Sequence, residues 1–389
     1  MTVVGILKES YPGERRVAIV PASVPNLVKA GCKVVVEAGA GLEAGYPDNQ
    51  YSEKGAEITP KRADVFNAAN VLVQVLCYGA NDKTGRADLE MLKPEQVMFG
   101  FLRALGSPET VREIAGVGVT AFAVELMPRI TRSQSMDALS AMATVCGYKA
   151  VVIAANQLPR FFPMLTTAAG TITPARVLVL GAGVAGLQAI ATARRLGAVA
   201  SAYDVRPAVK EQVQSLGGRF VELPIEAADA QDARGYARPQ EESFIARQRD
   251  LLARVIAESD VVISTATVPT KRAPILVTAD MVASMAPGSV IVDLAAERGG
   301  NCELTRYNEM VTEHGVTIVG YFNLASTVPY HASHMFSRNV TAFLLHLCKD
   351  GQVNIDTQDE IIRETLVTRS GEVVHGRVRD LLSLPAQTA

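Results

Sequence analysis

Six residues near the middle of the chain have the types and spacing of a phosphate-binding turn. They are Gly181-Ala-Gly183-Val-Ala-Gly186, which follow the apolar run 177–180 and precede a helix-forming segment. In such a turn the first glycine permits a tight bend, the second lets backbone N–H groups approach a pyrophosphate, and the third lets the helix pack on the strand. The pyrophosphate would then lie at the positive end of the helix. The pattern therefore favours a dinucleotide site over a glycine-rich turn that holds no ligand.

An acid follows at the end of the next apolar run. Asp204 lies about 20 residues beyond the glycines, where dinucleotide-binding domains carry the carboxylate that binds the adenosine ribose hydroxyls. This carboxylate would repel the 2′-phosphate of NADP(H), whereas Arg206 would soften that repulsion, so we expect a preference for NAD(H). The expected nucleotide contacts in this region are Gly181, Ala182, Gly183, Val184, Gly186, Asp204, Val205 and Arg206.

A second polar group precedes a long apolar segment. Arg129, Gln134, Asp137 and Ser140 place a cation, an amide, a carboxylate and a hydroxyl around a turn that enters a helix. Ser133, Ser135 or Asp137 could simply cap that helix, because short polar side chains accept hydrogen bonds from its first N–H groups. Capping explains one of these residues but not the set. From the residues alone, a polar site and a helix cap both remain open.

The elements that must position these residues form two series. In the first, the segments 3–7, 33–37, 71–75 and 97–101 are expected strands, and 21–30 and 108–115 are expected helices. This alternation predicts a parallel sheet. After an expected helix over 135–156, strands end at Asp204, Leu223, Thr265, Leu294 and Tyr321, with helices near 208–216, 243–258 and 278–285.

The chain ends with a helical run over 330–349 and a polar tail without a strand series of its own, so we expect the tail to return to the first domain. The predicted fold class is α/β, with two Rossmann-like doubly wound parallel-sheet domains, the first discontinuous. The expected domains are 1–148 plus 331–389, and 149–330, the latter binding the dinucleotide. The nicotinamide is expected at the carboxyl ends of the strands, in a cleft between the domains.

One loop interrupts the second series. Residues 227–242 are mostly small or charged and form a long loop for an α/β domain, with Gly235 and Tyr236 near its middle. Loops of this length are either functional or decorative. Its position after the third strand of the nucleotide series leads us to expect a lid over the dinucleotide.

Composition excludes several classes of function. The net charge is −2 with no basic block, so nucleic acid is not an expected partner. The five cysteines are scattered, which indicates free thiols in a reducing compartment. His331 and His334 lack flanking cysteines or acids, so no metal is expected. The apolar stretch 138–155 is interrupted by Tyr148 and Lys149, and we expect a buried helix rather than a membrane span.

The chain resembles the NAD(H)-binding component of the proton-translocating NAD(P) transhydrogenases, in the form in which that component is a separate soluble subunit. The resemblance covers essentially the whole chain. It is carried by 5–9, 126–137, 181–196 and 293–301, and the spacing of Arg129, Gln134, Asp137 and Ser140 is specific to this family.

The resemblance implies roles for individual residues. Arg129 and Asp137 would position the nicotinamide end of NAD(H), and Gln134 would reach across a subunit interface toward NADP(H) held by a partner. Tyr236 matches the tip of a mobile loop that closes over the nucleotide. The implied catalytic residues are Arg129, Gln134, Asp137, Ser140 and Tyr236, and the further implied cofactor contacts are Ile130, Thr131, Ser135, Met136, Gly235, Gln248 and Thr267.

The resemblance also implies an assembly. It predicts a homodimer of this chain, an NADP(H)-binding partner subunit and membrane-spanning subunits that couple Re/Si-specific hydride transfer from NADH to NADP⁺ with proton translocation. The expected location is cytoplasmic, with peripheral attachment to the membrane through those partners.

The main alternative is an NAD-dependent amino-acid dehydrogenase of the alanine type, a more distant resemblance. Those enzymes carry a Lys and a His where this chain has Leu76 and Arg103, although Arg16 is retained. Oxidising an amino acid needs a base for the departing proton. Hydride transfer between two nicotinamides moves no proton at the reacting carbons and needs proximity, orientation and exclusion of water. A non-catalytic NAD-binding regulator is the third possibility.

Overall fold

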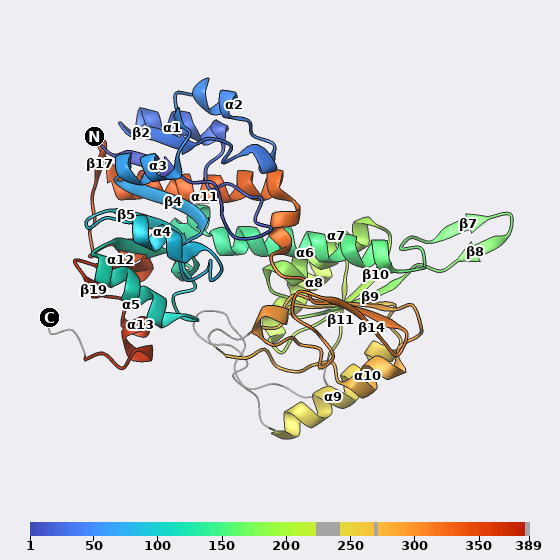
Figure 1. The fold of residues 1–389 in the computed structure, drawn as a ribbon. Helices are drawn as coiled ribbons and strands as arrows, with labels where there is room; N and C mark the ends of the chain where they lie inside the picture. The colour runs from blue at the N-terminus through green and yellow to red at the C-terminus, as the bar shows by residue number, and fades with distance from the viewer. Residues whose placement is uncertain (223–241, 268–270, 386–389) are drawn as a thin grey trace. The chain divides into compact units, whose positions relative to one another are not determined.

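The computed structural model describes residues 1–222, 242–267 and 271–385. The chain divides into two compact units (Figure 1). Unit 1 comprises Met1–Met142 and Ser326–Ala389, and unit 2 comprises Ala143–Ala325. Each unit has its own main sheet, so the chain leaves the first unit, builds the second and returns.

The main sheet of unit 1 has eight strands in the order β19-β18-β6-β5-β4-β1-β2-β3. Strands β1 to β6 are parallel to one another, and β18 runs antiparallel to β6. The strands are β1 (Val3–Ile6), β2 (Lys33–Glu37), β3 (Glu57–Thr59), β4 (Val71–Leu76), β5 (Val97–Phe101), β6 (Thr120–Ala123), β18 (Leu366–Arg369) and β19 (Glu372–Val373).

The main sheet of unit 2 has seven strands in the order β11-β10-β9-β12-β13-β15-β14. All neighbours are parallel except the pair β14 and β15. The strands are β9 (Arg176–Leu180), β10 (Val199–Tyr203), β11 (Arg219–Phe220), β12 (Val261–Ser264), β13 (Val290–Asp293), β14 (Met310–Glu313) and β15 (Val316–Val319). Two small antiparallel pairs complete the strands: β7 (Leu165–Thr167) with β8 (Gly170–Ile172), and β16 (Cys348–Lys349) with β17 (Gln352–Val353). These two mostly parallel sheets confirm the predicted fold class.

Helices connect the strands in both units. The α-helices are α1 (Val24–Lys29), α2 (Asp48–Ser52), α3 (Arg62–Ala68), α4 (Gly85–Met91), α5 (Pro108–Val117), α6 (Ala138–Gln157), α7 (Val184–Arg195), α8 (Lys210–Ser215), α9 (Glu242–Ala257), α10 (Ala279–Ser284), α11 (Pro329–Leu347), α12 (Glu360–Thr365) and α13 (Gly376–Leu381). Short 3-10 turns are η1 (Pro21–Ser23), η2 (Leu42–Ala44), η3 (Val124–Leu126), η4 (Thr131–Met136), η5 (Pro207–Val209), η6 (Ala296–Arg298) and η7 (Leu324–Thr327).

The apolar runs of unit 2 are continuous because both faces of its sheet are covered. On β9, Val177 and Val179 pack in one core, and Leu178 and Leu180 pack in another. A parallel sheet with helices on both faces requires apolar residues at successive positions, not at alternate ones. This explains why the sequence shows uninterrupted apolar strands before Gly181.

The C-terminal segment contributes strands that the sequence analysis did not predict. β18 pairs with β6, and β19 extends the same edge of the unit 1 sheet. The sequence analysis expected a tail with no strand series of its own, and the strands β18 and β19 that the tail does form extend the sheet of unit 1. These strands are too short for a periodic pattern, and β18 is fully or partly buried along its length because it lies inside the sheet.

Helix α6 is long and apolar, as the sequence analysis expected. By length and composition it could cross a bilayer, with a mean hydropathy of 1.6, so the interruptions at Tyr148 and Lys149 do not exclude a span. A single such helix is weak evidence, because core helices meet the same criteria. Ala150, Val151 and Ala154 are buried in the core of unit 2, although the helix is covered along only a fraction of its surface.

Candidate dinucleotide site

The glycine turn follows β9 at the position where the strand order of unit 2 reverses. β10 lies on one side of β9 and β12 on the other, so the chain crosses over in opposite directions from this point. Open parallel sheets bind ligands outside the carboxyl ends of the strands at such a position. The structure thus places the sequence motif where a dinucleotide site is expected.

The three glycines meet different local requirements. Gly181 has a φ of +97°, a conformation that residues with a Cβ rarely adopt. A Cβ at Gly186 would lie 1.9 Å from the carbonyl oxygen of Gly181, so only glycine lets α7 approach β9 this closely. A Cβ at Gly183 would meet no atom within 4 Å. The backbone at Gly183 is therefore open, as contact with a pyrophosphate requires.

The Asp204 carboxylate is held at the end of β10 by four hydrogen bonds. Its Oδ2 accepts from the Ala182 N–H at 2.8 Å and from Arg206 Nη2 at 2.7 Å. Its Oδ1 accepts from the Arg206 N–H at 2.9 Å and from Nε at 2.8 Å. The carboxylate in turn raises the pKa of the Arg206 guanidinium. Because a carboxylate has about four acceptor positions, a ribose can bind here only if it shares or displaces these donors.

We expect Asp204 and Arg206 to affect nucleotide choice in opposite directions. Asp204→Asn should weaken NADH binding about tenfold or more, because hydrogen bonds to a charged acceptor are lost. It should also reduce the ratio by which the chain prefers NADH to NADPH. Arg206→Met should increase the preference for NADH over NADPH, since it removes the cation that can neutralise a 2′-phosphate. The chain contains no tryptophan, so the fluorescence of bound NADH and NADPH can be titrated directly. Equal affinity of the native chain for both nucleotides would show that Arg206 dominates.

The residues after β12 lie against the glycine turn. The Thr265 hydroxyl donates to the Gly181 carbonyl at 2.9 Å, and the Thr265 N–H donates to Leu180 at 2.8 Å. Ala266 and Thr267 follow directly, and Thr267 is half-buried. The structure therefore brings the predicted contact Thr267 to the same edge of the sheet as the turn.

The other predicted contacts of unit 2 are placed as follows. Gln248 is buried on α9, and its Nε2 donates to the hydroxyl of Tyr203 at 3.0 Å. Tyr203 directly precedes Asp204 in the sequence. Burial raises the pKa of Tyr203 to about 12. Val184 is exposed and Val205 is half-buried. Gly235 and Tyr236, and with them the expected lid, lie outside the described residues.

Sequence reasoning missed two buried polar residues that support this edge. Asp293 ends β13, and Asn301 lies in the loop after η6. Both are fully buried, and Asp293 accepts hydrogen bonds from five groups, including the Asn301 N–H at 2.7 Å. The acid at the end of an apolar strand was a signal that could have been used. Nothing in the local pattern around Asn301 pointed to its contacts.

The segment from Arg129 to Ser140 lies in unit 1 and includes η4 and the start of α6. The Asp137 Oδ1 accepts from the Ser140 N–H at 2.9 Å, and Oδ2 accepts from the Ser140 hydroxyl at 2.6 Å. Asp137 is thus the cap of α6, which was one of the two possibilities left open. Capping the helix and contacting a ligand are compatible roles for one carboxylate.

The remaining residues of the segment differ in exposure. Arg129, Thr131, Gln134 and Ser135 are exposed, Ile130 is half-buried and Met136 is buried. The Gln134 amide has no hydrogen-bond partner among the residues that the structure describes. Ser133 is buried and donates to Ile130 and Pro128, which keeps the turn compact.

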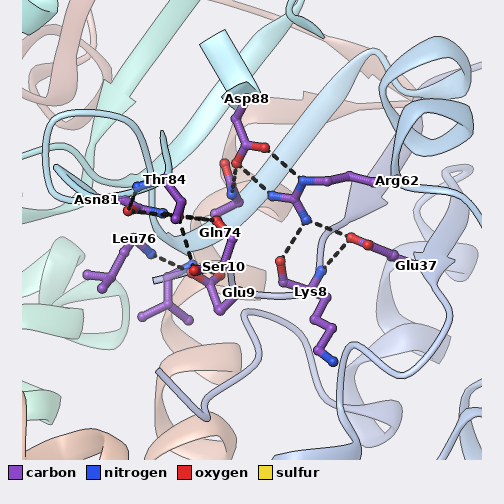
Figure 2. Close-up of polar contacts among 11 residues, drawn as sticks. Lys8, Glu9, Ser10, Glu37, Arg62, Gln74, Leu76, Asn81, Thr84 and Asp88 are labelled. Atoms are coloured by element: carbon purple, nitrogen blue, oxygen red, sulfur yellow. Dashed lines mark hydrogen bonds and ion pairs between the residues drawn. The ribbon is translucent and has the colours of Figure 1, made fainter. Parts of the chain in front are cut away.

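Unit 1 has its own reversal of strand order, between β1 and β4, and a network of polar side chains lies there (Figure 2). The Glu9 carboxyl accepts from the N–H groups of Val75 at 2.6 Å and Leu76 at 3.1 Å. Beside it, Arg62 binds Asp88 at 2.6 Å and Glu37 at 2.7 Å. This polar network ties the ends of β1, β2 and β4 to helices α3 and α4.

Burial raises the pKa of Glu9 to about 8, the Glu14 carboxylate adds to the rise, and the two backbone amides oppose it. Between the ordinary value of 4.5 and about 8, the folded chain holds a proton that the unfolded chain has released. The free energy of unfolding should therefore fall as pH rises through this range, by on the order of 5 kcal/mol. Glu9→Gln should flatten that slope in urea unfolding at pH 5, 6.5 and 8. The exposed control Glu95→Gln should leave the slope unchanged, and an equal effect of both changes would contradict the assignment.

Comparison with known proteins agrees with this geometry. The N-terminal domain of the family described as alanine dehydrogenase/PNT matches residues 5–146, and its C-terminal domain matches 150–376. The chain belongs to this family. It is 45% identical over 375 residues to an NAD(P) transhydrogenase alpha-subunit chain of Rhodospirillum rubrum, covering 96% of this chain and 97% of that protein.

Structural similarity follows the same order. A transhydrogenase from Sinorhizobium meliloti is 43% identical, with a TM-score of 0.85 over 96% of this chain and all of that one. An L-alanine dehydrogenase is 26% identical, with a TM-score of 0.80 over 98% of this chain and 99% of that one. The chain is thus a homologue of the transhydrogenase alpha subunit, and alanine dehydrogenases are more distant members, as the sequence analysis expected.

Proposed function

We propose that this chain is the NAD(H)-binding subunit of a proton-translocating NAD(P) transhydrogenase and passes hydride from NADH to NADP⁺ held by a partner subunit. The observation that carries the proposal is the glycine turn after β9, located where the strand order reverses, with Asp204 at the end of the neighbouring strand β10. The homology to the transhydrogenase alpha subunit supports it.

The proposed chemistry needs binding and orientation rather than acid–base catalysis. A hydride that moves between two nicotinamides leaves no proton to transfer, so proximity and exclusion of water supply the rate. Arg129 and Asp137 would orient the nicotinamide, with Ser140 supporting Asp137 and Tyr236 closing over the nucleotide. Gln134 would align the two rings, for which its exposed and unpartnered amide is suited within the described structure.

The proposal includes an assembly. NADP(H) would be supplied by a partner subunit, and proton translocation would belong to membrane-spanning subunits that hold this chain at the cytoplasmic side.

We also propose a homodimer. Phe161, Met164 and Ile172 are exposed on and next to the β7–β8 hairpin, and apolar side chains exposed in this way are typical of interfaces. A monomer mass in sedimentation equilibrium at micromolar concentration would contradict the dimer.

The experiment that tests the function mixes the purified chain with the NADP(H)-binding component of a transhydrogenase and measures NADPH formation from NADH. We expect transfer only when both components are present. NAD⁺ reduction that depends on alanine would instead support an amino-acid dehydrogenase, and NADH binding without transfer to any NADP-binding partner would support a regulator. The exposed Arg103 and the buried Leu76, at the positions of the missing His and Lys, predict no alanine oxidation.

A further inference from the structure

One buried side chain, that of Asn301, binds the backbone of Ala266 and of Pro274. The Asn301 Oδ1 accepts from the Ala266 N–H at 3.0 Å. Its Nδ2 donates to the carbonyls of Ala266 and Pro274, both at 2.8 Å. A carboxamide can accept from one backbone group and donate to two others, whereas a carboxylate can only accept and a hydroxyl has a single proton. The contacts are therefore specific to asparagine or its longer homologue glutamine.

Asn301 is itself held rigidly. Its N–H donates to Asp293 Oδ2 at 2.7 Å, and its carbonyl accepts from the N–H groups of Leu276 at 2.8 Å and Val277 at 3.0 Å. Asn301 and Asp293 are both fully buried. In such a network the position of one backbone group is set by all the others, because unpaired polar groups are costly away from water.

Ala266, which Asn301 binds through both its N–H and its carbonyl, lies directly against the glycine turn. A Cβ at Gly181 would be 3.1 Å from the backbone nitrogen of Ala266 and 2.7 Å from the hydroxyl of Thr265. Any movement of Ala266 would therefore reach the turn on one side and Thr267 on the other.

We propose that Asn301 is a positioning residue of the NAD(H) site, which fixes Ala266 and Thr267 against the turn at Gly181. This inference rests on the proposed binding of NAD(H) by unit 2. The Asn301 side chain forms its hydrogen bonds with Ala266 and Pro274 and with none of the predicted cofactor residues in the described structure, so it acts through the backbone of Ala266. Its loss should weaken NADH binding and should leave the transfer rate at saturating NADH nearly unchanged.

The test compares two substitutions with a control for stability. Asn301→Asp has the same shape but cannot donate to the two carbonyls, and Asn301→Ser provides a smaller, uncharged change if the buried carboxylate prevents folding. The control is Ile318→Val, a change in the core of unit 2 on β15, which lies two strands from β12. NADH fluorescence titration, thermal unfolding and single-turnover transfer are measured for each variant at a temperature where it is folded.

We expect the dissociation constant for NADH to rise about tenfold in the Asn301 variants and to stay within about twofold of the native value in Ile318→Val. The saturated transfer rate should stay within about threefold of the native rate. An unchanged dissociation constant for NADH in folded Asn301→Ser would overturn the positioning role. So would a loss of NADH affinity in Ile318→Val when its melting temperature falls as much as that of the Asn301 variants. Absence of NADH binding by the native chain would instead refute the proposed function itself.

Discussion

Gln134→Asn will slow hydride transfer from NADH by about 10- to 100-fold and leave NADH affinity nearly unchanged. The shorter side chain retains the amide but moves it by about the length of one methylene, and misplacement on the order of 1 Å can cost 10²-fold in rate. An interaction that matters chiefly in the transition state lowers the rate without weakening ground-state binding. Single-turnover transfer to NADP⁺ on the partner component, combined with NADH titration, measures both quantities.

The matched control is Gln50→Asn, the same change at an exposed position on α2 of unit 1, which should affect neither quantity. If Gln134 only supports the turn before α6, its substitution should instead lower stability and NADH affinity while transfer at saturating nucleotide stays normal. A native transfer rate in Gln134→Asn would end the assignment of this residue to the reaction.

Gly183→Ala and Gly186→Ala should separate the two demands on the glycine turn. A methyl group at Gly186 would lie 1.9 Å from the Gly181 carbonyl oxygen, so α7 must move, and we expect a loss of stability of about 3 kcal/mol together with loss of NADH binding. At Gly183 the methyl group would meet no atom within 4 Å, and the φ of −75° suits alanine. Stability should therefore be unchanged, while NADH binding falls at least about tenfold because the methyl group occupies the space for the pyrophosphate.

Thermal unfolding and NADH fluorescence titration of both variants check this prediction. Gly116→Ala on α5, where a Cβ is equally unobstructed, is the control and should retain both stability and binding. Normal NADH affinity in Gly183→Ala would show that the pyrophosphate does not lie against this backbone, and the position of the whole site would then be in doubt.

The features that could be predicted from the sequence are those with local physical causes. A φ of +97° at Gly181 and a close helix–strand contact at Gly186 both require glycine, so the turn was visible as a spacing of residues. Strand segments buried on both faces must be apolar at successive positions, which is why β5 and the apolar centre of β2 (34–36) were recognised, and both strands were predicted with their observed bounds. The capping of α6 by Asp137 was likewise among the local possibilities.

The start of one helix was predicted where a proline marks it. Helix α5 was predicted to begin at Pro108, where it does begin, but its predicted end at residue 115 lies two residues before its observed end at Val117, which precedes Gly118 with a φ of +85°. By contrast, the short strands β3 and β6 were missed, because runs of three or four residues give too weak a periodicity to distinguish from loops.

Only the tertiary structure shows which distant groups meet. Some of these contacts join segments far apart in the chain: β18 pairs with β6, Glu9 binds the end of β4, and Asn301 binds Ala266. Others depend on side-chain conformation, as do the donors around Asp204. Such contacts follow from the packing of whole elements and leave no trace in local residue spacing. The sequence by itself therefore determined the family, the fold class and the location of the glycine turn. The tertiary structure decided how Asp204 is neutralised and what holds the turn in place, because both depend on contacts between buried polar groups.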